Sequence, residues 1–190
     1  MIKEAHLNNY FLIRHGHSEA NSRGIIVSNP ETGTIKYGLT KNGKKQVLAA
    51  AADFSITEDL IIYSSDFLRT KETAEILKET LHSGDIIYTP LLRERFFGFY
   101  DGLDDDQYNE VWIRDKDNED NKINSVESPR QVSNRVESLI SMIESKYSGK
   151  NILLVSHGDC LQIMQTVFQN ISPAKHRTLT HLNVAEIRKI

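Results

Sequence analysis

The chain has 190 residues, a formal net charge of −3 and a hydrophobic fraction of 39%, a size and composition typical of a soluble globular protein. No apolar run approaches membrane-spanning length, and the small negative charge does not favour nucleic acid, so we expect neither a membrane nor a nucleic-acid partner. No secretory leader is recognisable, and the single cysteine, Cys160, excludes an internal disulfide. These features predict a cytoplasmic protein.

The acidic side chains are concentrated in one part of the chain. Residues 101–120 carry nine acidic and two basic side chains, a net charge of −7, so the remaining residues carry +4. Such a run is typical of a solvated surface segment. It also fits a lid that uses Tyr108 and Trp112 as apolar contacts and disfavours substrates with several negative charges. We therefore predict a single domain over residues 1–190 with an acidic, lid-like insertion at about 101–127.

The predicted elements alternate between strands and helices along the chain. Short apolar runs bounded by polar or turn residues predict strands, in chain order, over 10–13, 60–63, 86–88 and 152–155. An alternating tail predicts an edge or closing strand over 183–187. Apolar residues at helical spacing predict helices over 41–54, 67–81 and 129–147, with another from about 160. This order favours an α/β protein, a three-layer α/β/α sandwich with a mostly parallel central sheet.

Two of these helices have clear N-terminal signals. Thr40 is a suitable N-cap for the helix over 41–54. For the helix over 129–147, Ser128 is the expected N-cap, Pro129 occupies the first turn and Gln131 completes a capping box. The start of the second helix is therefore the most securely predicted boundary in the chain.

Two predicted strands end in a histidine followed by a glycine. The strand over 10–13 runs into Arg14-His15-Gly16, and the strand over 152–155 runs into Ser156-His157-Gly158. The carboxyl ends of parallel strands border the crevice in which ligands bind. The Arg14 guanidinium matches a phosphate or carboxylate, and a neutral His15 is a nucleophile. A single histidine would often be a core residue, but the pair points to an anion site that contains a nucleophile.

Four sequence blocks follow one another in a distinctive order. They are Arg14 to Asn21, Ser64 to Ala74, Leu92 to Gly98, and Ser156-His157-Gly158. This order resembles the histidine phosphatase superfamily, the phosphoglycerate mutase-like proteins, and the resemblance spans residues 10–187. It implies a phosphoglycerate mutase-like fold and phosphoryl-transfer chemistry, with no cofactor and no metal.

The resemblance implies the reacting groups of a phosphomonoester hydrolase. His15 would attack phosphorus and become phosphohistidine, which splits one difficult step into two. Glu94 would act as the general acid for the leaving group and then as the general base for water. To hold a proton near neutral pH, the Glu94 carboxyl needs a pKa raised by burial or by a nearby negative charge.

The resemblance also implies a set of phosphate-binding residues. Arg14 and Arg69 would donate to phosphoryl oxygens, and His157 would add a further donor. Asn21 and Gly158 match positions beside the phosphate in the family. The Asn21 side chain is equally suited to turning the chain through a local hydrogen bond.

Two other classes of function compete with this interpretation. His15, His17, His157 and Asp159 could form the ligand set of a zinc hydrolase, although the chain is shorter than the roughly 250 residues of a typical metallohydrolase barrel and Arg14 would stand beside the metal. A non-catalytic phospho-ligand-binding module is the other class. The presence of every expected reacting residue favours an enzyme over such a module.

Within the enzyme class, a cofactor-dependent phosphoglycerate mutase is the alternative to a phosphatase. Mutase relatives carry a longer, arginine-containing insertion before the second histidine, whereas the corresponding segment here is short and acidic. This favours hydrolysis of a small phosphorylated metabolite, with phosphoprotein substrates still open. His176, Arg177 and His181 follow the last helix on a late loop from which they could reach a substrate, but we predict that they are solvated loop residues.

Overall fold

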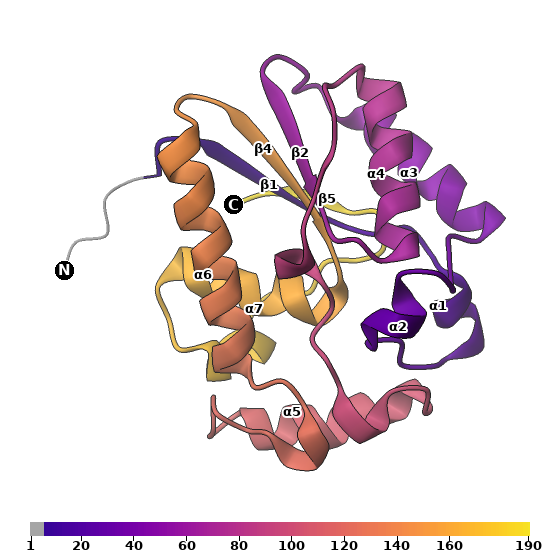
Figure 1. Ribbon diagram of the computed structural model, residues 1–190, viewed down its shortest axis with the longest axis vertical. Coiled ribbons are helices and arrows are strands. Elements are labelled where there is room, and N and C mark those ends of the chain that lie inside the picture. Colours follow the sequence, from indigo (N-terminus) through magenta and orange to yellow (C-terminus); the bar gives the residue numbers. More distant parts are fainter. Residues whose placement is uncertain (1–5) are drawn as a thin grey trace.

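The computed structural model describes residues 6–190. Residues 1–5, which belong to the segment where we expected no secretory leader, lie outside the described residues. Five strands form one sheet in the order β3-β2-β4-β1-β5 (Figure 1). β1 pairs in parallel with β4, β4 with β2, and β2 with β3, whereas β5 is antiparallel to β1. The predicted mostly parallel sheet is therefore confirmed. The strands are β1 (Asn9–Arg14), β2 (Leu60–Ser64), β3 (Ile87–Tyr88), β4 (Asn151–Ser156) and β5 (Ile187–Lys189).

The helices connect these strands and cover the sheet. The α-helices are α1 (Glu19–Arg23), α2 (Pro30–Gly33), α3 (Lys41–Asp53), α4 (Leu68–Leu81), α5 (Tyr108–Asp115), α6 (Pro129–Lys146) and α7 (Gly158–Gln169). Short 3-10 helices are η1 (Pro90–Leu92), η2 (Gly98–Tyr100), η3 (Asp105–Gln107), η4 (Ile123–Ser125) and η5 (Pro173–Thr178). The predicted caps are confirmed, since the Thr40 side chain accepts from the Gly43 amide and Ser128 forms a capping box with Gln131.

Helices lie on both faces of the sheet and enclose two hydrophobic cores. The side chains of β1 alternate between them: Tyr10 and Leu12 belong to the core that contains residues of α6 and α7, and Phe11 and Ile13 to the core that contains residues of α3 and α4. Figure 1 shows α6 and α7 on the opposite side of the sheet from α3 and α4. The three-layer α/β/α arrangement follows from this two-sided burial.

The predicted tail strand and the first connection differ from the structure. The edge strand lies at 187–189 instead of 183–187, because Ala185 has a φ of 58° and its amide donates to the carbonyl oxygens of Arg14 and His15. This turn prevents an extended conformation across the predicted segment. Helices α1 and α2 were not predicted, since they are too short to show a helical apolar period.

Residues 101–127 fold over one end of the sheet. In Figure 1 this segment, which contains α5, lies at the bottom of the view, beyond the strands. It is not merely solvated, because Val111 and Val126 join residues of neighbouring segments in a small separate core, which consists of Ile26, Phe97, Tyr100, Val111 and Val126. The segment therefore packs as a cover, and its movement as a lid stays a prediction. Within residues 6–190, no helix is long and apolar enough to cross a membrane.

Candidate active site

The two predicted histidines lie side by side because their strands are neighbours. Arg14 at the end of β1 is in register with Ser156 at the end of β4, so the following residues, His15 and His157, leave the sheet together. Their ring centroids are 5.3 Å apart. This separation is close to the spacing of about 4.8 Å between adjacent strands.

The hydrogen bonds of His15 determine which ring nitrogen is nucleophilic. Its Nδ1 lies 2.8 Å from the carbonyl oxygen of Gly16 and must donate to it, which leaves a lone pair on Nε2. In the unliganded site this lone pair accepts from Nε of Arg69 at 3.0 Å. Burial, with Arg69 and Arg14 nearby, lowers the pKa of His15 well below its usual value. The imidazole is therefore neutral at physiological pH.

A close contact with α3 restricts the residue that follows the nucleophile. A Cβ atom on Gly16 would lie 2.6 Å from the carbonyl oxygen of Gly43 and 2.8 Å from Cγ2 of Val47. Only glycine fits this contact without moving the backbone. Because the Gly16 carbonyl accepts from the His15 ring, this packing also fixes the orientation of the imidazole.

Arg14 and Arg69 place unpartnered donors next to His15. Arg69, near the start of α4, is 4% exposed, and its Nη2 donates to the carbonyl oxygen of Val27 at 3.0 Å. Within the described residues, Nη1 of Arg69 and Nε of Arg14 are buried without a hydrogen-bond partner. Burial lowers the pKa of Arg69 to about 10, so its guanidinium remains charged at neutral pH. Buried charged donors without an acceptor indicate an anion site.

His157 adds a third donor of the same kind. Its Nε2 lies 2.9 Å from Oγ of Ser65, and that hydroxyl also accepts from the Phe67 amide. If the Ser65 hydroxyl donates to Nε2, the ring carries its proton on Nδ1, which is buried and has no partner among the described residues. Burial, together with Arg69 and the His15 ring, lowers the pKa of His157 well below its usual value. His157 is therefore neutral, and in the tautomer protonated on Nδ1 it is a donor to an anion.

Glu94 is buried and held by two backbone amides. Its Oε1 accepts from the amides of Arg95 at 2.9 Å and Cys160 at 3.0 Å. Burial raises the pKa of Glu94, and the nearby carboxylate of Asp159 adds to the effect. Because two N–H groups already point at Oε1, a proton on this carboxyl group belongs on Oε2.

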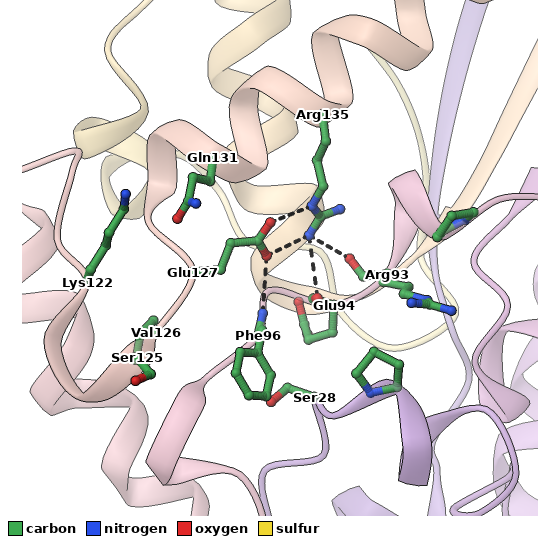
Figure 2. Close-up of a pocket in the computed structure, with 12 residues that line it drawn as sticks. Ser28, Arg93, Glu94, Phe96, Lys122, Ser125, Val126, Glu127, Gln131 and Arg135 are labelled. Carbon is green, nitrogen blue, oxygen red and sulfur yellow. Dashed lines mark hydrogen bonds and ion pairs between the residues drawn. The ribbon is translucent and has the colours of Figure 1, made fainter.

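The backbone around Glu94 is anchored by Arg135 of α6. Figure 2 shows Arg135 beside a pocket on the surface, where its guanidinium pairs with Glu127 and donates to the carbonyl oxygens of Arg93 and Glu94. Arg93 is itself paired with Asp66 at 2.6 Å. Arg93 and Arg135, the two arginines of this pocket, thus hold the loop around Glu94 in place through these contacts.

A small cavity joins most of the predicted site residues. Arg14, His15, Asn21, Arg69 and Glu94 line it, together with Tyr108 from α5 and residues that follow β1, which are Ser18, Ala20, Ile25 and Val27. The side chain of Asn21 also accepts from the Ser18 amide in the capping box of α1, so both sequence interpretations of Asn21 fit its position.

Gly158 lies against an arginine of the cavity wall. A Cβ atom on Gly158 would lie 3.3 Å from Cζ of Arg14 and 3.4 Å from Cε1 of His181. Gly158 is the first residue of α7. Its position makes room for the Arg14 guanidinium, and a direct contact with phosphate stays a prediction.

Sequence reasoning missed the residue that orients Arg14. Nη1 of Arg14 lies 2.6 Å from Nε2 of His181, and Nδ1 of His181 lies 2.8 Å from Oε1 of Gln162. The amide of Gln162 donates to the carbonyl oxygens of His176 and Leu179, so Oε1 is its acceptor atom. His181 must therefore donate from Nδ1 and accept from Arg14 at Nε2.

The prediction that the late-loop residues are solvated was wrong for two of them. His176 is fully buried and His181 is half-buried, whereas Arg177 is exposed as expected. Arg177 nevertheless lies 3.7 Å above the ring of Trp112. Because these contacts join residues far apart in the sequence, no local pattern could have revealed them.

A buried ion-pair network lies behind Glu94. Arg95 is fully buried and donates to both oxygens of Asp115, at 2.6 and 2.9 Å, and to Asp159 at 3.1 Å. Burial alone would raise the pKa of Asp159, but the nearby His176 and Arg95 keep this pKa below its usual value. The network ties α5, through Asp115, to α7, through Asp159.

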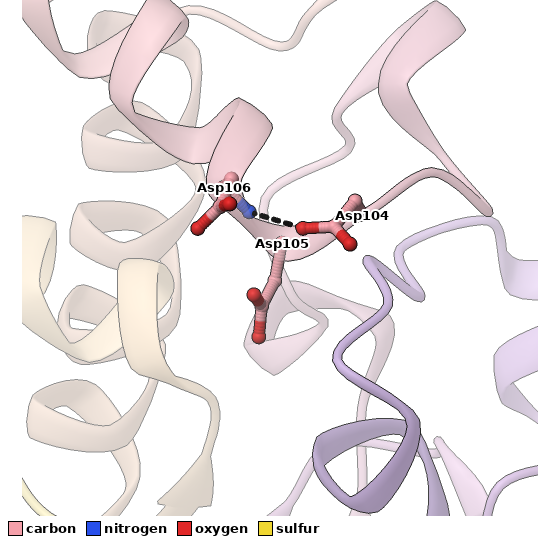
Figure 3. Close-up of side chains that lie close together, drawn as sticks. All are labelled: Asp104, Asp105 and Asp106. Atoms are coloured by element: carbon pink, nitrogen blue, oxygen red, sulfur yellow. Dashed lines mark hydrogen bonds between the residues drawn. The ribbon is translucent and has the colours of Figure 1, made fainter.

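The ligand set of the competing zinc hydrolase is not assembled. Nδ1 of His17 lies 3.2 Å from Oγ1 of Thr40, away from the cavity. Across residues 6–190, the one group with mutual distances suited to a metal ion consists of Asp104, Asp105 and Asp106, shown in Figure 3. These carboxylates are exposed, and nothing further points to a cation there.

Comparisons with known proteins identify the family of the chain. The family model described as histidine phosphatase superfamily (branch 1) matches residues 10–190. The chain is 27% identical to a metal-independent phosphoserine phosphatase of Arabidopsis thaliana, over 97% of this chain and 79% of that one. It is 32% identical to a probable phosphoglycerate mutase of Escherichia coli, over 80% and 70%.

A solved structure shows the same fold. A phosphoserine phosphatase of Entamoeba histolytica, in complex with 3-phosphoglyceric acid, covers 95% of this chain and 88% of its own, with a TM-score of 0.76 and 24% identity. The predicted phosphoglycerate mutase-like fold is confirmed by this match and by the family model. The chain belongs to the histidine phosphatase superfamily.

Proposed function

We propose that this protein is a phosphomonoester hydrolase that works through a phosphohistidine at Nε2 of His15. The observation that carries the proposal is that three of the four buried nitrogen atoms without a partner among the described residues, Nε of Arg14, Nη1 of Arg69 and Nδ1 of His157, lie around one point. All three residues surround the His15 ring. A phosphoryl group at this position would supply the missing acceptors through its equatorial oxygens.

The first half of the reaction forms the phosphohistidine. The lone pair on Nε2 of His15, released from Arg69 when phosphate takes over that donor, attacks phosphorus in line with the leaving oxygen. As the bond to that oxygen breaks, Oε2 of Glu94 gives its proton to the leaving alkoxide, and the free alcohol departs. The raised pKa of Glu94 supports this role, because it favours the protonated carboxyl group before reaction.

The second half returns the enzyme to its starting state. The Glu94 carboxylate removes a proton from a water molecule, whose oxygen attacks phosphorus and breaks the bond to Nε2 of His15. The products are inorganic phosphate, a neutral His15 and a protonated Glu94. Nδ1 of His15 keeps its hydrogen bond to the Gly16 carbonyl throughout, which stabilises the charge that develops on the ring.

Two observations favour a hydrolase over a mutase and guide the choice of substrate. Arg14 and Arg69 are the cationic side chains among the residues that line the cavity, so they provide for one phosphoryl group and leave no cation there for the second phosphate that the bisphosphate cofactor of a mutase carries. Phosphoserine is a natural first substrate, because one relative is named as a phosphoserine phosphatase. We propose a small phosphorylated metabolite as the substrate class.

The test is phosphate release from a panel of phosphomonoesters in the presence of EDTA. The panel contains an aryl phosphate, phosphoserine, sugar phosphates and 3-phosphoglycerate, and isomerisation of the phosphoglycerate is assayed in parallel. We expect release by the wild type, loss of release in His15→Ala by about 10³-fold or more, and near-normal release in the matched control His17→Ala.

The other outcomes contradict the proposal in distinct ways. Isomerisation without release would identify a mutase. Loss of activity with EDTA would reinstate a metal hydrolase. Phosphate binding without turnover of any ester would identify a phospho-ligand-binding module.

A further inference from the structure

The roof of the active-site cavity is formed by a tyrosine from the acidic segment. Tyr108, the first residue of α5, lines the cavity together with His15, Arg14, Arg69 and Glu94. It lies close enough to both arginines and to the Glu94 carboxyl group to interact with each electrostatically. Tyr108 is therefore the part of the cover that faces the reacting groups.

The Tyr108 ring is held by two other aromatic rings. The Trp112 ring stacks on it with a centroid distance of 5.1 Å and an interplanar angle of 6°, and Phe97 meets its edge at 4.7 Å and 78°. Such contacts fix the orientation of a ring as well as burying it. The phenol group is consequently held in place before a ligand arrives.

Trp112 is in turn attached to α7 and to the segment that follows it. Its Nε1 donates to Oδ1 of Asp159 on α7 at 3.0 Å, and the guanidinium of Arg177 lies 3.7 Å above its ring. Asp159 also accepts from the buried Arg95. These attachments connect the roof to the body of the protein through α7.

The hydroxyl of Tyr108 is a suitable donor to an anion. Burial, with the nearby Glu94 carboxyl group, raises the pKa of Tyr108 well above its usual value, so the phenol keeps its proton. No hydrogen bond from this hydroxyl to another described residue accounts for its position. Arg14 and Arg69 line the same cavity as Tyr108 and would hold a phosphoryl group next to its hydroxyl.

We propose that Tyr108 contacts the substrate: its hydroxyl donates to a phosphoryl oxygen, and its ring restricts the leaving group to a small alcohol. This inference rests on the proposed phosphatase function and extends it by naming a specificity-determining residue. The ring accounts for the size limit, because it is the part of α5 that lines the cavity and is held there by Trp112 and Phe97. The hydroxyl accounts for affinity, because a hydrogen bond to a charged oxygen is stronger than one between neutral groups.

The hydroxyl is tested by a binding measurement that does not depend on turnover. The chain contains a single tryptophan, and because that residue, Trp112, stacks on Tyr108, its fluorescence reports directly on the roof. We expect inorganic phosphate to change this fluorescence, and Tyr108→Phe to weaken phosphate binding by roughly tenfold to a hundredfold. Tyr100→Phe is the matched control, since that hydroxyl bonds Glu110 and Asn124 in the same segment, and we expect it to bind phosphate normally.

The ring is tested by the size of the substrate. In Tyr108→Ala, we expect the ratio of kcat/KM for a bulky ester to kcat/KM for phosphoserine to rise by roughly tenfold. If circular dichroism shows that the alanine variant folds poorly, Tyr108→Leu takes its place. Tyr108→Phe, which keeps the ring, should leave that ratio unchanged. An unchanged ratio in the alanine and leucine variants would overturn the size limit.

The outcomes separate this inference from the proposed function. Normal phosphate binding by Tyr108→Phe, with phosphatase activity intact, would overturn the hydroxyl contact and leave the function standing. Phosphate binding that requires Tyr108, in a protein that hydrolyses no ester, would support the contact while overturning the hydrolase.

Discussion

The buried network around Arg95 makes a quantitative prediction about stability. In Arg95→Met, the carboxylates of Asp115 and Asp159 lose the guanidinium that bonds them at 2.6–3.1 Å. The carbonyl oxygen of Glu127 also loses its donor at 2.6 Å. Breaking a buried pair by removing one partner costs about 3–5 kcal/mol, because it leaves uncompensated buried charge. Typical domains have a free energy of unfolding of about 5–15 kcal/mol, so this substitution removes a large part of it.

Urea denaturation, followed by Trp112 fluorescence and by circular dichroism, measures this loss. With an m-value of about 2 kcal/mol/M, the expected change corresponds to a fall in the midpoint of roughly 1.5–2.5 M. Lys78→Met is the matched control, because it breaks the exposed pair with Asp85, and solvent screening leaves such pairs with little effect on stability. A midpoint for Arg95→Met no lower than that of the control would refute the reasoning.

The same variant has a predicted pH dependence. In the wild type the pKa of Asp159 is held below its usual value, against the effect of burial, by His176 and Arg95. A depressed carboxyl pKa contributes stability above the unfolded value of about 3.9, and this contribution is lost as the pH falls through the folded value. The difference in stability between wild type and Arg95→Met should therefore be full at pH 7 and narrow below about pH 4.

Three further predictions concern activity. Glu94→Gln should lower kcat/KM far more for alkyl than for aryl phosphates, because an alkoxide leaving group needs a proton and an aryl oxide scarcely does. The pKa of Glu94 is raised, and the wild type loses this acid as the pH rises through it, so its kcat/KM for the alkyl ester should fall at alkaline pH, whereas that of the variant should not. Equal losses on both substrates would exclude Glu94 as the acid. His181→Ala should raise KM roughly tenfold by freeing the Arg14 guanidinium, and an unchanged KM would show that His181 does not position it. Replacing Asp104, Asp105 and Asp106 with asparagine removes negative charge near the cavity, because Asp104 forms a β-bridge with the cavity residue Ile25. This triple substitution should raise kcat/KM for a bisphosphate, relative to a monophosphate, a few-fold. An unchanged ratio would show that these carboxylates do not affect the choice of substrate.

The sequence was sufficient to predict the frame of the molecule and the residues at the strand ends. The unbroken apolar run before Ser156-His157-Gly158 and the similar run before Arg14 fix two parallel strands, and the geometry of a sheet then brings their final residues together. The start of α6 was equally predictable, because Ser128, Pro129 and Gln131 interact only with their immediate neighbours. Local chemistry and regular periodicity decide all of these features.

Contacts between loops that are distant along the chain could not be predicted from the sequence. Nothing near His181 in the chain indicates that it accepts from Arg14, 167 residues away. Arg95 is similar, since its burial depends on carboxylates brought from α5 and α7. In the acidic segment the sequence pointed to Tyr108 and Trp112 as apolar contacts, but not to their stacking on each other or to the burial of Val111 and Val126 against other segments.

The neighbouring positions of β1 and β4 have a consequence for how such a protein can diversify. The separation of the two histidines is set by the hydrogen bonding between β1 and β4. The roof over them is instead a single excursion of the chain, the surface segment between Asp101 and Glu127. Changes in the length or charge of that excursion that keep Tyr108 and Asp115 should therefore alter the substrate range, as the proposed role of the roof implies, while leaving the two histidines in place.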